Sequence, residues 1–60
     1  MTFKQAIQKA NRLNKKTGKP YYVIHELNFY DEWDYIVTGE YDLDTYFHRV
    51  PDSRILHCAE

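Results

Sequence analysis

The side chains best suited to hold a metal ion or to act as nucleophiles are three histidines and one cysteine: His25, His48, His57 and Cys58. A structural zinc site takes four such ligands, usually in closely spaced pairs. The adjacent residues His57 and Cys58 fall in a segment with strand character, and neighbouring strand residues point to opposite faces. The sequence therefore predicts no metal site, and nothing in it indicates another cofactor.

Nucleophilic catalysis would require Cys58 or a serine beside a histidine and an orienting acid. Cys58 lies two residues from the end of the sequence, where fraying would disturb such an arrangement. A single strand histidine can serve as acid or base, as in small toxin-like ribonucleases with related α+β folds, and His25 is the candidate by position. Only the residue type of His25 supports a ribonuclease. The other interpretation is that His25 is a hydrogen-bonded or surface histidine without a catalytic role. We predict no catalytic residues.

Charge is the unusual feature of this chain, because a net charge of −1 conceals two oppositely charged segments. Residues 1–19 contain no acidic side chain and carry Lys4, Lys9, Arg12, Lys15, Lys16 and Lys19, whereas residues 20–60 carry nine acidic side chains and two arginines. A basic helix face of this kind can follow a phosphate backbone. The alternative is a solvated face, since the acidic remainder repels nucleic acid.

The basic segment also has the strongest helix signals. Thr2 and Gln5 have the spacing of a capping box, and the apolar residues between Phe3 and Leu13 recur on one side of a helix, opposite the cations. Gly18 suits the left-handed conformation that ends helices, and Pro20 prevents continuation. The sequence predicts a helix over residues 3–17.

The rest of the chain reads as three strands and a short helix. Residues 21–27 and 33–38 are rich in β-branched and aromatic residues and predict an antiparallel hairpin, and residues 54–58 predict a third strand. Leu43, Tyr46, Phe47 and Val50 have helical spacing, so we expect a helix over residues 43–50. The elements follow in the order helix, strand, strand, helix, strand, and form one α+β domain over residues 1–60. A right-handed crossover from the second strand through the second helix places the third strand beside the first, which gives an antiparallel sheet of order 2-1-3.

Alternation along the hairpin raises a question about the second face of this sheet. If both helices cover the face of Val23 and Val37, then Tyr22, Ile24 and Ile36 emerge on the other face as a protein interface. If the helices divide between the two faces, no such cluster is left exposed. The alternation is clean on neither face, so both arrangements stay open.

Function follows from these features only as an expectation. A single cysteine allows no internal disulfide and indicates a reducing compartment, and the short apolar runs are typical of a cytoplasmic protein without membrane contact. We expect a small non-enzymatic interaction or accessory protein of the bacterial or phage type, with a protein partner or a second copy of itself and no small-molecule substrate. The alternatives are nucleic-acid binding through the basic helix face and the ribonuclease centred on His25.

Overall fold

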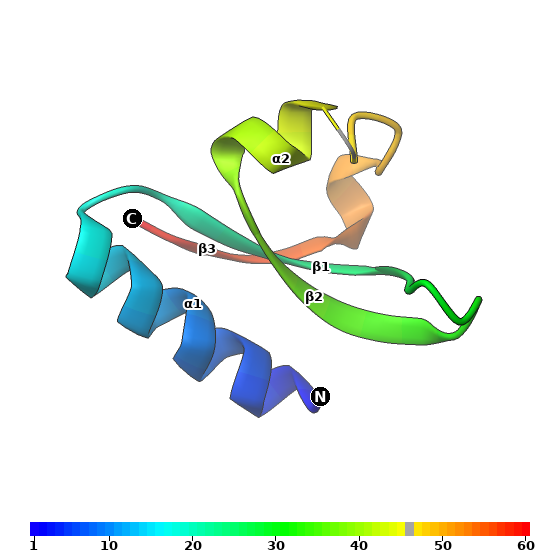
Figure 1. The fold of residues 1–60 in the computed structure, drawn as a ribbon, viewed down its shortest axis with the longest axis horizontal. Helices are drawn as coiled ribbons and strands as arrows, with labels where there is room; N and C mark the ends of the chain where they lie inside the picture. Colours follow the sequence, from blue (N-terminus) through cyan, green and yellow to red (C-terminus); the bar gives the residue numbers. More distant parts are fainter. Residues whose placement is uncertain (46) are drawn as a thin grey trace.

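Two helices and a three-stranded antiparallel sheet form the fold, in the predicted order (Figure 1). A computed structural model describes residues 1–45 and 47–60. Its elements are α1 (Phe3–Thr17), β1 (Tyr21–Leu27), β2 (Trp33–Gly39), α2 (Glu40–Thr45), the 3-10 turn η1 (Asp52–Arg54) and β3 (Ile55–Ala59). The strand order is β2-β1-β3, so the predicted fold class is confirmed.

The bounds of α1 are those that the sequence predicts, because both of its ends are specified locally. The Thr2 hydroxyl accepts a hydrogen bond from the Gln5 amide at 3.1 Å, and the Thr2 amide donates to the Gln5 side chain at 2.9 Å. At the other end Gly18 has a φ of 73°, and its amide donates to the Asn14 carbonyl at 2.7 Å. These contacts satisfy backbone groups that a helix leaves without partners.

The register of the sheet places the odd-numbered residues of β1 on one face. Val23 lies opposite Val37 of β2, and Ile24 lies opposite both Ile36 of β2 and Ile55 of β3. A register irregularity between Val23 and Ile24 interrupts the pairing with β3. Because side chains alternate along a strand, the valines face α1 and the isoleucines face the other side of the sheet.

The second helix differs from its prediction. It begins at Glu40, directly after β2, and ends at Thr45 rather than spanning residues 43–50. Acidic residues in its first turn complement the positive end of the helix dipole. The Val50 amide donates to the Phe47 carbonyl at 2.9 Å, so the chain turns where helical spacing predicts a continuing helix. Tyr46, which contributed to that prediction, lies outside the described residues.

The two helices divide between the two faces of the sheet (Figure 1). On one face, the small side chains Ala6 and Ala10 let α1 approach Val23 and Ala59 closely, and these four residues form a buried cluster. α2 and η1 lie on the opposite side, where Ile24 is 0% exposed. Ile24 therefore cannot belong to the predicted protein interface, and Tyr22 and Ile36 are half-buried beside it.

Candidate interaction surfaces

The connection between β1 and β2 is a tight loop organised by one asparagine. The Asn28 side-chain oxygen accepts hydrogen bonds from the amides of Tyr30 at 2.8 Å and Glu32 at 3.1 Å. The Asn28 backbone bonds to Glu32 and Asp31, and Asp31 takes a left-handed φ of 58°, a conformation that aspartate tolerates better than most residues. These hydrogen bonds are all made within the loop. The aromatic side chains of the loop, Phe29 and Tyr30, point into solvent.

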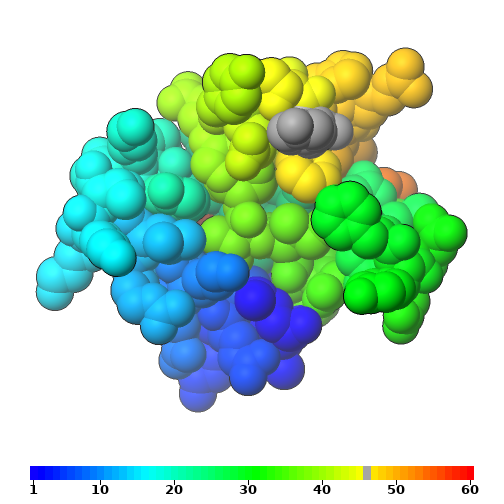
Figure 2. Space-filling view, viewed as in Figure 1, coloured from blue at the N-terminus to red at the C-terminus, as the bar shows by residue number. Residues whose placement is uncertain are grey.

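Four large apolar side chains are exposed at this end of the molecule, and we call them the hairpin surface. Their exposed fractions are 42% for Leu27, 104% for Phe29, 82% for Tyr30 and 52% for Trp33. The space-filling view shows the tip of the hairpin, in green, projecting from the body (Figure 2). Leu27 and Trp33 lie opposite each other in the sheet, and Phe29 and Tyr30 follow in the loop that joins their strands. Large apolar side chains exposed close together in this way can mark interaction sites.

A row of neighbouring rings connects the hairpin surface to the start of α1. Ring centroids are 5.3 Å apart for Phe3 and Tyr35, 5.0 Å for Tyr35 and His25, and 5.2 Å for His25 and Trp33. Because α1 begins at Phe3, beside Tyr35, the helix covers the sheet only up to that point. Leu27 and Trp33 lie beyond the helix and stay partly exposed for that reason.

Arg54 contacts the same end of the sheet from η1. Its guanidinium carbon lies 4.7 Å from the centre of the Trp33 ring, and its Nη1 lies 3.4 Å from the Glu26 carboxylate. A cation over an indole ring is attracted by the negative face of the ring. The site thus already contains one combination of guanidinium, aromatic ring and carboxylate.

The segment that carries the hairpin surface is rich in acidic residues. Residues 26–34 include Glu26, Asp31, Glu32 and Asp34 and contain no lysine or arginine. A hydrogen bond from the N-terminal ammonium at 3.0 Å, together with one from the Tyr35 amide at 2.8 Å, holds the pKa of Asp34 below its ordinary value. Asp34 is ion-paired with the N-terminal ammonium and Glu26 with Arg54, so Asp31 and Glu32 are the carboxylates of this segment without an ion-pair partner among the described residues.

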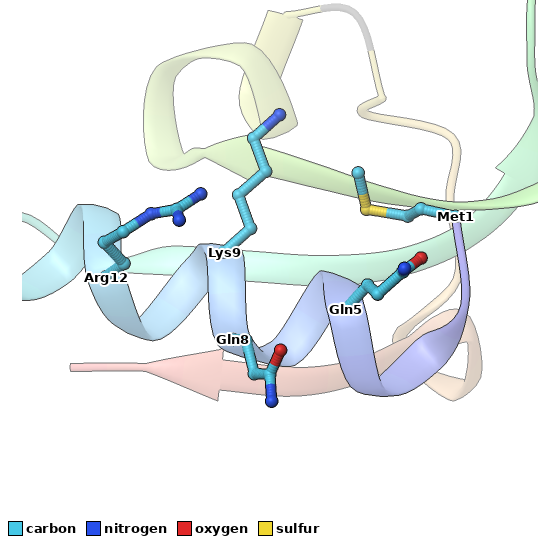
Figure 3. Close-up of a pocket in the computed structure, with 5 residues that line it drawn as sticks. All are labelled: Met1, Gln5, Gln8, Lys9 and Arg12. Atoms are coloured by element: carbon cyan, nitrogen blue, oxygen red, sulfur yellow. The ribbon is translucent and has the colours of Figure 1, made fainter.

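The second candidate surface is the outer side of α1, which we call the cationic face. Its members are all exposed: Lys4, Lys9, Arg12, Lys15 and Lys16, with Lys19 just past the helix end. Two ion pairs occur within residues 1–45 and 47–60, Met1 ammonium with Asp34 and Arg54 with Glu26, and neither involves these cations. A shallow hollow of about 260 Å³ lies among Met1, Gln5, Gln8, Lys9 and Arg12 (Figure 3).

The histidines and the cysteine are dispersed over the fold. His25 packs between Trp33 and Tyr35, and His57 donates from Nε2 to the Asn11 side chain at 3.0 Å, which joins β3 to α1. His48 lies 3.0 Å from the Thr45 carbonyl, and Cys58 is an exposed free thiol. In the described part of the chain, no three histidine, cysteine or acidic side chains come close enough together to hold a metal ion.

The sequence patterns did not predict the hairpin surface. The signal available was the placement of Phe29 and Tyr30 between Asn28 and Asp31, residues that favour turns. Aromatic side chains inside a short turn have little of their own element to pack against. Such a pair therefore indicates exposure, whereas the same pair within a strand indicates a core.

Comparison of the chain with protein-family models, with curated proteins and with solved structures gave no match. None of the helices among the described residues has the length and apolar character needed to cross a membrane.

Proposed function

We propose that this chain is a non-enzymatic protein-binding domain that meets its partner through the hairpin surface. The observation that carries the proposal is the exposure of Leu27, Phe29, Tyr30 and Trp33 together at one end of the sheet. Aromatic side chains are enriched in the centres of protein interfaces, and tryptophan and tyrosine are frequent among the residues that dominate binding energy.

The way these side chains are held also supports binding. The Trp33 ring lies 5.2 Å from the His25 ring, centroid to centroid. The loop backbone is fixed by hydrogen bonds from the Tyr30 and Glu32 amides to the Asn28 side chain and from the Asn28 amide to the Glu32 carbonyl. A surface that is ordered before binding loses less conformational entropy when the complex forms. Burying these rings against a partner would also remove apolar area from water, at about 25 cal/mol per Å².

Site-specific photo-crosslinking in the organism that encodes the chain tests this proposal. A photoreactive phenylalanine analogue is placed at position 29 in one variant and at position 41 in another. Tyr41 is the matched control, because it is also an exposed aromatic residue but belongs to α2. We expect a discrete crosslinked protein from position 29 that is lost when Trp33→Ala is added, and none from position 41. Equal crosslinking from both positions, or none from position 29, would contradict the proposal.

A second candidate function is nucleic-acid binding through the cationic face. Six exposed cations without a carboxylate partner in the described part of the chain favour it. Binding to a labelled random duplex should weaken with salt, with a log-log slope of about −0.9 for each phosphate contacted. Lys9→Gln with Arg12→Gln should reduce that slope, whereas Arg49→Gln, an exposed cation outside α1, should leave it unchanged. If neither duplex nor single strand binds at about 50 mM salt, this candidate is eliminated.

A further inference from the structure

We infer that the ligand of the hairpin surface is a protein segment that combines arginine or lysine with apolar side chains. This inference rests on the proposed function and specifies the chemistry of the partner. It follows from the charges around the surface, from a contact that the chain makes with itself, and from the combination of groups that a ligand must supply.

The charges around the hairpin surface favour a cationic ligand. Of the four carboxylates within residues 26–34, Glu26 and Asp34 are ion-paired. The other two, Asp31 and Glu32, are exposed and take part in no ion pair among the described residues. Charges act over about 8 Å at physiological ionic strength. A ligand that covers the hairpin surface comes within that distance of them, so a basic segment is attracted, whereas an acidic segment or a nucleic acid is repelled.

Arg54 shows how a guanidinium fits this environment. It lies 4.7 Å from the ring centre of Trp33 and 3.4 Å from a Glu26 oxygen, so it uses an aromatic face and a carboxylate at the same time. Phe29 and Tyr30 offer the same two chemical groups in combination with Asp31 and Glu32. In the residues that the structure describes, Arg54 over Trp33 is the one cation above an aromatic ring, so these further rings are free to receive cations from a partner.

A cation alone would leave the apolar part of the surface uncovered. Leu27 and the part of Trp33 that stays exposed present apolar area to water, and apolar side chains of a ligand would bury that area. The cationic face of a second copy supplies lysines, but the apolar stripe of α1 is already buried against the sheet at Ala6 and Ala10. A foreign segment with both kinds of side chain therefore fits the hairpin surface better than a second copy does.

Trp33 is the only tryptophan in the chain and is partly exposed, so its fluorescence reports binding directly. The probe is a short synthetic peptide with arginines and leucines in a glycine-serine background. Two matched peptides replace either every arginine by glutamate or every leucine by serine. We expect the arginine-leucine peptide to bind at least about tenfold more tightly than either one, a ratio that corresponds to 1.4 kcal/mol, with affinity that falls as salt is added.

Charge reversal at the hairpin provides the matched variant. Asp31→Asn with Glu32→Lys should abolish binding of the arginine-leucine peptide and improve binding of the glutamate-leucine peptide. Asparagine also tolerates the left-handed backbone at position 31, so the loop is kept. Asp42→Lys with Asp44→Lys is the control, because these exposed carboxylates belong to α2, and it should change neither affinity. Circular dichroism establishes that each variant is folded.

Three results would overturn the inference. Equal binding of the arginine and glutamate peptides would remove the charge requirement. Perturbation of Trp33 fluorescence by a nucleic acid, or sedimentation showing self-association that Trp33→Ala abolishes, would assign the surface to a different occupant. Equal peptide binding leaves the protein crosslink at position 29 intact, and self-association gives a crosslink to a second copy there, so both are distinguishable from failure of the proposed function, in which that crosslink is absent. A nucleic-acid occupant would remove the protein crosslink as well and would contradict both proposals.

Discussion

The two ends of the sheet use similar side chains in opposite ways. Where α1 and α2 cover it, Val23 and Ile24 are fully buried, with Ala6 and Ala10 packed against Val23. Past the start of α1, Leu27 of the same strand and its partner Trp33 in β2 remain exposed. Apolar character alone therefore does not make a core in this chain. A residue stabilises the fold only where a covering element reaches it, and the hairpin end lies outside that reach.

The largest expected effect is at the covered end. Ile24→Ala should lower the free energy of unfolding by about 2–5 kcal/mol, because it removes fully buried atoms and leaves a cavity. A chain of this length has roughly 3–9 kcal/mol in total. Urea unfolding followed by circular dichroism measures the change. Leu27→Ala on the same strand is the comparison and should cost less than about 1 kcal/mol; equal losses would erase the distinction between the two ends.

A smaller effect is expected at the end of α1. Gly18→Ala should cost about 1–2 kcal/mol, because an L-residue with a side chain pays that amount in the left-handed conformation. No atom lies within 4 Å of the added carbon, so the loss comes from the backbone and not from a clash. Lys19→Ala, at the next exposed position, is the control in the same unfolding experiment. An unchanged midpoint for Gly18→Ala would show that the helix end is remodelled at little cost.

The next effect concerns pH and the hairpin end. The pKa of Asp34 is lowered in the folded chain by its hydrogen bonds, so its contribution to stability is present above the ordinary value of 3.8 and is lost as pH falls through the lowered value. Asp34→Asn should therefore flatten the decline of stability below about pH 4. Thermal unfolding across that range measures it, with Asp52→Asn in η1 as the control. If both variants retain the wild-type profile, the Asp34 contacts do not stabilise the fold.

The smallest expected effect on stability is at the tip of the hairpin. Phe29→Ser with Tyr30→Ser should change the free energy of unfolding by no more than about 0.5 kcal/mol, since neither ring is buried. The same double variant should lose the peptide binding described above. A large loss of stability would instead assign the two rings to the fold and would weaken the case for a binding surface.

Local signals explain which parts of the fold the sequence predicted. The capping box at Thr2, the left-handed Gly18 and the 3.6-residue apolar period specify α1 within a few residues of chain, and its bounds are as predicted. β1 also matches its prediction, whereas β2 extends one residue further and β3 is shifted by one residue. Short edge segments depend on pairing partners, so their ends are less strongly specified.

The second helix and the candidate site show where local signals were insufficient. A spacing that covers barely two turns predicted residues 43–50, but isolated short helices are marginal and take their bounds from packing. The exposure of Trp33 depends on where α1 begins over Tyr35, a relation between residues more than thirty positions apart. Neither propensity nor periodicity contains that information.

By itself, then, the sequence determined the element types, the order of the fold and the segregation of cations into residues 1–19, because each depends on side chains close together in the chain. Only the tertiary structure decided that the two helices take opposite faces, that Ile24 is buried and that the apolar hairpin end stays open. Those outcomes depend on which surface each helix covers, and coverage is a property of the packed molecule.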